Sequence, residues 1–111
     1  MPQTSEFEAD AQGTPLQITS NRDGDSVTIS LLGDLDLASV RELGTAILVA
    51  EKGDATLIVV DLAEVTFIDS TGLSQLMDAK KRNNGRLRIK PSNHDAVARV
   101  LSLTRTTEIV E

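Results

Sequence analysis

A short apolar run in the middle of the chain constrains the fold most. Leu57-Ile58-Val59-Val60 are consecutive apolar residues, mostly β-branched, and they stand directly before Asp61. A run of this kind, too short for a helix, is typical of a strand covered on both faces. Because helical patterns lie on both sides of it, we expect strands and helices to alternate around a central strand that Asp61 ends.

Three segments have the apolar spacing of amphipathic helices. Either Asp36 or a capping box at Ser39 begins the first, and Gly53 ends it. The second runs from about residue 71 to residue 83, and Ser92 opens the third. The side chains expected to face the core are Val40, Leu43, Ile47 and Ala50 in the first helix, Leu73, Leu76 and Met77 in the second, and Val97, Val100 and Leu101 in the third.

Alternating apolar residues predict an antiparallel hairpin near the start of the chain. Residues 16–19 and 27–31 alternate on either side of the turn-forming residues 21–25. A short strand is expected at residues 87–89, and a last strand at residues 108–110 is left open. The hairpin face expected to look inward carries Leu16, Ile18, Val27, Ile29 and Leu31.

The resulting order is β-β-α-β-α-β-α, with or without the last strand. A helix between two strands implies parallel pairing, whereas the hairpin is antiparallel, so the sheet is mixed. We therefore predict a single α/β domain over residues 14–111, preceded by a flexible, acidic tail at residues 1–13. Partners usually meet such a domain at the loops that follow its parallel strands.

Composition excludes several classes of function. The 111 residues include no cysteine and one histidine, His94, which removes thiol chemistry and leaves little for a metal site. A net charge of −6 and only two aromatic residues disfavour binding to nucleic acid or to an anionic membrane. We expect neither a signal peptide nor a membrane-spanning segment, because residues 1–13 have no basic start followed by an apolar stretch and no apolar run approaches about 20 residues. We expect a cytoplasmic interaction module with no cofactor, no metal and no catalytic activity.

Residues 65–73 join the central strand to the second helix. Ser70 lies where unpaired N–H groups and the positive end of the helix dipole stabilise an anion, which favours it as the carrier of a phosphate. The simpler alternative is that Asp69 or Ser70 only caps the helix. Thr71 is a second hydroxyl, but its β-branch and its place inside the first turn make Ser70 the better acceptor.

A second loop is expected on the same edge of the sheet. Gly33-Asp34-Leu35-Asp36 breaks the alternation and is expected to form a turn that follows another strand, so Asp34 and Asp36 are expected to lie close to Ser70. Both aspartates have an alternative role as turn and cap residues only.

These segments together resemble the STAS domain of bacterial anti-sigma factor antagonists. The resemblance covers about residues 14–110 and depends on Gly33-Asp34-Leu35-Asp36, on Val59-Val60-Asp61-Leu62 and on Phe67-Ile68-Asp69-Ser70-Thr71-Gly72-Leu73. In that family the serine directly after the aspartate is phosphorylated, which corresponds to Ser70. The resemblance implies a partner-binding surface formed by Asp34, Asp36, Asp69, Ser70, Thr71, Gly72 and Leu73.

The resemblance also implies the partners. The unphosphorylated domain would bind an anti-sigma factor with serine kinase activity and so free a sigma factor. Phosphorylated on Ser70 it would release that partner, and a phosphoserine phosphatase would reverse the modification. A phosphate adds about −1.5 to −2 charges beside Asp69, so repulsion and desolvation would lower the affinity. The chain departs from many relatives at Ser74, where they carry glycine, and in residues 102–111.

Two other interpretations stay open. STAS domains also serve as scaffolds in stress-signalling complexes. Asp61 and Lys90, each at the end of an expected strand, are similar to the aspartate and lysine of receiver domains, which are phosphorylated on aspartate with Mg²⁺. A receiver needs an acidic pair after its first strand, and here that strand belongs to a hairpin. We therefore favour phosphorylation of Ser70.

Overall fold

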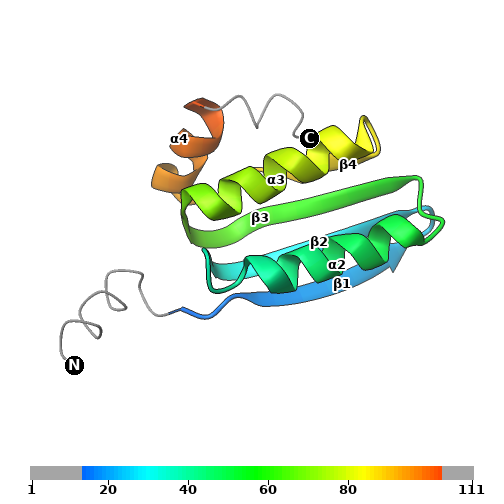
Figure 1. The fold of residues 1–111 in the computed structure, drawn as a ribbon, viewed down its shortest axis with the longest axis horizontal. Helices are drawn as coiled ribbons and strands as arrows, with labels where there is room; N and C mark the ends of the chain where they lie inside the picture. The colour runs from blue at the N-terminus through cyan, green and yellow to red at the C-terminus, as the bar shows by residue number, and fades with distance from the viewer. Residues whose placement is uncertain (1–13, 104–111) are drawn as a thin grey trace.

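The computed structural model describes residues 14–103, which form a mixed sheet with helices packed against it (Figure 1). The tail predicted at residues 1–13 and the strand left open at residues 108–110 lie outside the described residues. Along the chain the elements are β1 (Gln17–Asp23), β2 (Ser26–Leu35), α2 (Val40–Lys52), β3 (Leu57–Ile68), α3 (Ser70–Asn83), β4 (Leu87–Lys90) and α4 (Asp95–Leu103). The predicted order β-β-α-β-α-β-α is confirmed.

The four strands of this sheet are arranged in the order β1-β2-β3-β4. β1 and β2 are antiparallel. Their last paired residues are Asp23 and Ser26, which are joined by a turn in which Gly24 has a φ of +61°. β2 pairs with β3, and β3 with β4, in parallel. The mixed sheet and the interior position of the 57–60 strand therefore agree with the prediction.

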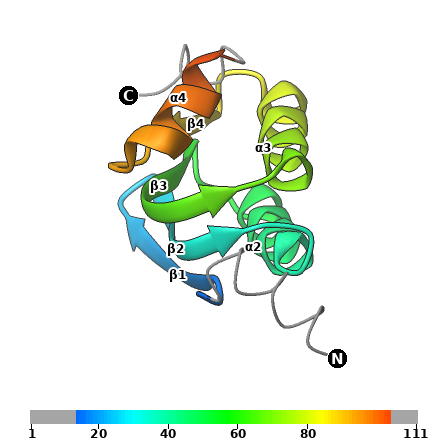
Figure 2. The ribbon, with the colours of Figure 1, turned by 90° about the vertical axis from the view of Figure 1, so that its left-hand side faces the viewer.

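The helices divide between the two sides of the sheet. α2 and α3 lie next to each other on one side, whereas α4 lies against β3 on the other (Figure 2). The loop before α4 is fixed to β3, because the Ser92 hydroxyl donates to the Val65 carbonyl at 2.7 Å and the Asn93 N–H donates to the Ala63 carbonyl at 3.0 Å. These bonds set α4 against the carboxyl half of β3.

One apolar cluster forms the core. Its fully buried members come from every helix and from β2, β3 and β4, as the apolar spacing predicts. They include Ile29, Leu31, Leu43, Ile47, Ile58, Val60, Leu76, Leu87, Ile89 and Leu101.

The inward face of α3 differs from the prediction. Met77 is 40% exposed, and Leu73 is half-buried. The buried residues of this helix are Gly72, Leu76 and Ala79, which recur at a spacing of four and three. Since Met77 follows Leu76 directly, it is rotated by about one quarter of a turn away from the core.

The central strand also differs from the prediction. Residues 62–65, expected as a link, belong to β3, so Asp61 does not end the strand. Ile58 and Val60 are fully buried but Leu57 and Val59 are half-buried, so only one face of the strand is closed. Register shifts against β2 leave extra residues in β3, and these bulges interrupt the alternation that would have identified the strand.

β2 is likewise longer than expected. Gly33, Asp34 and Leu35 were predicted as a turn, yet they pair with β3 as far as Ile68. Gly33 has a φ of +112°, and a Cβ there would lie 2.6 Å from the Pro15 carbonyl oxygen. A glycine that appeared to break the strand instead lets residues 14 and 15 cross close to it.

Candidate functional site

Two loops meet at the carboxyl ends of β2 and β3. Leu35 and Ile68 are register partners at the ends of these strands, and the Asp69 N–H donates to the Leu35 carbonyl at 3.2 Å. The turn at residues 36–39 and the start of α3 consequently lie against each other, and Asp36 is brought to the same edge as Ser70.

Asp69 ties these two loops together. It is the N-cap of α3, where its Oδ1 accepts from the Gly72 N–H at 2.9 Å. Its Oδ2 accepts from the Leu37 N–H at 3.2 Å. One carboxylate thus satisfies a free donor of the helix and also holds the turn that follows β2.

Ser70 is the first residue of α3, and its side chain is exposed. Thr71 and Leu73, in the same turn of helix, are half-buried. Of the two neighbouring hydroxyl residues, Ser70 is therefore the more accessible from solvent. It also stands at the helix end where backbone donors favour negative charge.

Gly72 allows the close approach of α3 to β2. The residue is buried, and a Cβ on it would lie 2.7 Å from Leu35 Cγ and 2.8 Å from the Leu35 carbonyl oxygen. Any side chain here would push the start of α3, and Ser70 with it, away from the sheet.

Asp34 occupies a different environment from the other site residues. It is only 4% exposed. Its Oδ1 accepts from the Thr66 hydroxyl at 3.2 Å and its Oδ2 from the Thr14 N–H at 3.4 Å. Thr66 is the extra residue at one β3 bulge, so Asp34 fixes the bulge, and its buried carboxylate is not available for direct contact with a partner.

The turn before α2 is held by Asp36 and Ser39. Asp36 Oδ1 accepts from the Ala38 N–H at 3.1 Å, and the Asp36 carbonyl accepts from the Val40 N–H at 3.0 Å. Ser39 makes no side-chain cap bond, so the expected capping box is absent, and its hydroxyl donates to the Asp34 carbonyl at 3.0 Å. The helix begins at Val40 with Ser39 at its N-cap position, so Asp36 does not start it earlier, and the bonds of Asp36 organise the turn that precedes the helix.

Leu37 lies at this edge of the sheet beside Asp69, and the sequence did not single it out. It is 72% exposed on the turn that Asp69 holds. The signal was weak, because Leu37 is an apolar residue in a turn but stands three residues before Val40 and so continues the apolar spacing of the helix that follows.

With this geometry established, the family of the chain follows from its sequence. A family model described as "Mlab, STAS domain" matches residues 18–111. The chain belongs to the STAS domain family.

Solved structures with this fold include anti-sigma factor antagonists. One from Mycobacterium paratuberculosis is 19% identical, with a TM-score of 0.77 over 86% of this chain and 83% of that chain. The unphosphorylated form of the anti-sigma factor antagonist SpoIIAA is 21% identical, with a TM-score of 0.69 over 86% of each chain. The phosphorylated form of the Bacillus cell fate determinant SpoIIAA is 18% identical, with a TM-score of 0.66 over 86% of this chain and 89% of that chain. Comparison with curated proteins gives no match.

A groove of about 350 Å³ runs between α2 and α3 of this STAS domain. Gln75 lines this groove and links the two helices, because its Nε2 donates to the Val40 carbonyl at 2.7 Å. The absence of a side chain at Gly44 leaves room for that contact. Thr71 and Ser74 lie on its α3 wall, so the groove begins directly beside Ser70. The other lining residues are Ile47, Asp78 and Arg82.

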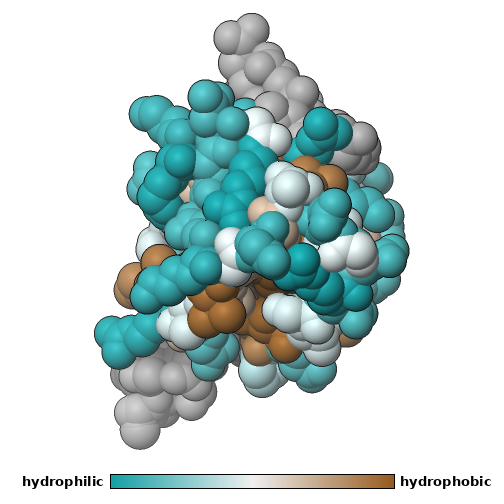
Figure 3. Space-filling view, turned by 90° about the vertical axis from the view of Figure 1, so that its right-hand side faces the viewer, coloured by the Kyte–Doolittle hydropathy of each residue, from teal (hydrophilic) through white to brown (hydrophobic). Residues whose placement is uncertain are grey.

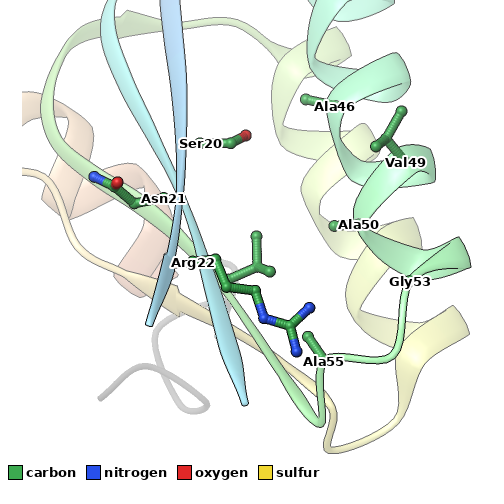
Figure 4. Close-up of a pocket in the computed structure, with 9 residues that line it drawn as sticks. Ser20, Asn21, Arg22, Ala46, Val49, Ala50, Gly53 and Ala55 are labelled. Atoms are coloured by element: carbon green, nitrogen blue, oxygen red, sulfur yellow. The ribbon is translucent and has the colours of Figure 1, made fainter. Parts of the chain in front are cut away.

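A second hollow of the STAS domain, of about 280 Å³, lies between β1 and α2 (Figure 4). Ala46, Val49 and Ala50 point into it from α2, opposite Ser20 and Arg22 (Figure 4). The hollow brings no nucleophile and base together, so it offers no catalytic arrangement.

Apolar surface gathers in the lower part of the face shown in Figure 3, at the end of the molecule where α2 ends.

Asp61 and Lys90 are the pair of the receiver interpretation. They are register partners on β3 and β4, and Lys90 Nζ lies 3.9 Å from Asp61 Oδ2. Asp61 stands within the strand, where its Oδ1 accepts from the Ala63 N–H at 2.9 Å. Within residues 14–103, no group of three or more histidines and carboxylates is arranged to hold a metal ion. The helices of that same range are all too short or too polar to cross a membrane.

Proposed function

We propose that this STAS domain is an anti-sigma factor antagonist controlled by phosphorylation of Ser70. Unphosphorylated, it binds an anti-sigma factor that is also a serine kinase, and a sigma factor is released. Phosphorylated, it lets the kinase go until a phosphoserine phosphatase restores it. The domain acts in the cytoplasm and catalyses no reaction itself.

The observation that carries this proposal is the exposed Ser70 hydroxyl at the N-terminus of α3, directly after the capping Asp69. A kinase reaches this hydroxyl without unfolding the helix. Solved relatives named as anti-sigma factor antagonists share the fold, and one of them was determined in a phosphorylated form. These likenesses support the proposal through the fold alone.

Charge gives the switch its direction. A phosphoserine adds about −1.5 to −2 charges beside Asp69 and Asp36. The N-terminus of α3 stabilises that charge inside the free domain by about 0.3–2 kcal/mol, so the fold survives. A partner that had matched the unmodified surface would have to desolvate the new charge, so its affinity falls.

The proposed partner surface consists of residues with different tasks. Asp36, Asp69, Ser70, Thr71 and Leu73 are exposed or half-buried and are available for contact. Gly72 and Asp34 are buried and act by holding the loops in place.

The test uses purified proteins. Each serine kinase of the anti-sigma factor type from the source genome is incubated with this chain and ATP, and the phosphorylated residue is identified by mass spectrometry. We expect modification of the wild type at Ser70, none in Ser70→Ala, and full modification in the matched control Ser74→Ala. Ser70→Ala should bind the kinase and Ser70→Asp should not. Equal binding of the two Ser70 variants would remove Ser70 from the mechanism.

The same samples separate the alternatives. A receiver would carry an acyl phosphate on Asp61, which acid and base hydrolyse, whereas phosphoserine survives mild treatment with either. A phosphate that is labile and absent from Asp61→Asn would replace our proposal with the receiver interpretation. A scaffold of a stress-signalling complex would bind its partners equally with serine, alanine or aspartate at position 70.

A further inference from the structure

Leu37 is an exposed apolar side chain on a rigid turn. It is 72% exposed, and the backbone N–H groups of residues 36, 37 and 38 each donate to an acceptor. The Asp36 side chain accepts from the Ala38 N–H at 3.1 Å, the Ser39 hydroxyl accepts from the Asp36 N–H at 3.0 Å, and Asp69 accepts from the Leu37 N–H. Because these three N–H groups of the turn are bonded, the Leu37 side chain is held in one place on the surface, so a partner pocket can bury it with little further loss of conformational entropy.

The position of Leu37 depends on the residue next to Ser70. Asp69 Oδ2 holds the Leu37 N–H at 3.2 Å while Oδ1 holds the Gly72 N–H at 2.9 Å. The two bonds share one carboxylate, so Asp69 cannot leave one donor without disturbing the other.

A phosphate on Ser70 would compete with this carboxylate. It is attached to the first residue of α3, so its oxygens reach the free donors of the first helical turn, to which the Gly72 N–H belongs. The phosphate carries more charge than a carboxylate and repels it as well. Both effects drive the Asp69 carboxylate away from the helix end, and the Leu37 N–H loses its acceptor.

We propose that Leu37 is the apolar anchor of the partner-binding surface and that phosphorylation of Ser70 withdraws it by releasing its turn from Asp69. This inference rests on the proposed function and names the regulation of the same site. The matching partner surface is an apolar pocket with Lys or Arg at its rim, because the anchor stands beside the carboxylates of Asp36 and Asp69.

The first experiment needs no partner. Phosphoserine is genetically encoded at position 70 of the full chain, and amide hydrogen exchange is followed by NMR. We expect the Leu37 amide to exchange about tenfold faster than in the unmodified chain, the effect of losing one hydrogen bond. Amides at the centre of the sheet, such as that of Ile58, should be unchanged. Equal protection of Leu37 in the two forms would overturn the coupling.

A matched variant separates the two tasks of Asp69. Serine is a good N-cap but has one oxygen, so Asp69→Ser keeps a cap for α3 and loses the acceptor for Leu37. We expect fast exchange at Leu37 and retained protection at Leu73, whose N–H donates to the backbone carbonyl of residue 69 at 3.0 Å. Loss of protection at both amides would reduce Asp69 to a helix cap and contradict its role in positioning Leu37.

The anchor is tested with the kinase that modifies Ser70. Leu37→Ala should bind it at least about tenfold more weakly than the wild type, as removal of an interface anchor does. The matched control is Val49→Ala, which truncates an apolar side chain that is 68% exposed near the C-terminal end of α2. A kinase that phosphorylates Ser70 and binds Leu37→Ala as tightly as the wild type would overturn the anchor and leave the proposed function standing. If none of the kinases modifies Ser70, the proposed function fails, and the anchor fails with it.

Discussion

Gly72 and Leu35 are in contact where α3 meets the end of β2, and the contact leaves no space for a Cβ. That atom would lie 2.7 Å from Leu35 Cγ and 2.8 Å from the Leu35 carbonyl oxygen. The carbonyl is also the acceptor for the Asp69 N–H, so it is not free to move aside. The glycine of the family's motif therefore has a packing role in this chain.

We predict that Gly72→Ala is destabilising. Alanine favours the helix by about 1 kcal/mol, but overpacking against a fixed backbone costs about 1–3 kcal/mol. The net loss should be up to about 2 kcal/mol in a urea titration. Gly44→Ala is the control, because its Cβ would meet only the end of the Gln75 side chain, at 2.8 Å. That variant should stay within about 1 kcal/mol of the wild type. Equal effects of the two changes would contradict the role of Leu35.

Local patterns were sufficient to predict most of the fold. The spacing of Leu43, Ile47 and Ala50 identified α2, because an amphipathic helix repeats its apolar face regardless of what packs against it. The same reasoning failed at Met77, since small residues such as Gly72 and Ala79 carry little hydrophobic signal and yet form the inward face of α3.

Long-range contacts explain what the sequence concealed. The bulges of β3 are specified by its pairing with β2 and by the bond from Thr66 to Asp34, 32 residues apart. The burial of Asp34 depends on that bond too, so a residue expected at a partner surface proved to be internal. Leu37 was missed because its partner, Asp69, is equally distant in the chain.

Asp34 should stabilise the fold through Thr66. We predict that Asp34→Asn lowers the free energy of unfolding by about 1–3 kcal/mol, because a buried charged acceptor is lost and an amide N–H₂ is left facing other donors. In a double-mutant cycle with Thr66→Val, the two changes should be less than additive by about 1 kcal/mol. Additive losses would show that the two side chains act independently. If Asp34 acts only through the fold, folded Asp34→Asn should still be phosphorylated on Ser70.

Glu51 should make the stability of the domain depend on acid pH. Its side chain is 13% exposed and joins α2 to α3, accepting from Asn83 Nδ2 at 2.6 Å and from Arg82 at 2.9 Å. Burial acts to raise the pKa of Glu51, but the hydrogen bonds from Asn83 and Arg82 and the charges of Arg82 and Arg86 outweigh it, so the pKa lies below 4.5.

The sign of the effect follows from this lowered pKa. The native carboxyl binds a proton less tightly than the unfolded one, so its stabilisation is complete above the unfolded pKa and is lost as the pH falls through the native value. We predict that Glu51→Gln is less stable than the wild type at pH 7 and that the difference shrinks on acidification below about pH 4.5. Thermal unfolding of both proteins between pH 7 and pH 3 measures this difference in stability. A difference that is constant with pH would assign the effect to packing.

Arg86 should stabilise the C-terminus of α2, where the last carbonyls have no partner within the helix. Its guanidinium donates to the carbonyls of Ala50, Glu51, Gly53 and Ala55 at distances of 3.4, 3.1, 3.1 and 3.0 Å. We predict that Arg86→Met, which keeps the apolar stem, lowers the free energy of unfolding by about 2–3 kcal/mol, because charged donors to partly buried carbonyls are removed together. Arg86→Lys should recover part of this loss, since one ammonium group cannot reproduce the planar fork. Arg99→Met, at an exposed position of α4, should change stability by less than about 0.5 kcal/mol. If urea titrations gave the two methionine variants the same free energy of unfolding, water would be as good a hydrogen-bond donor to these carbonyls as Arg86 is.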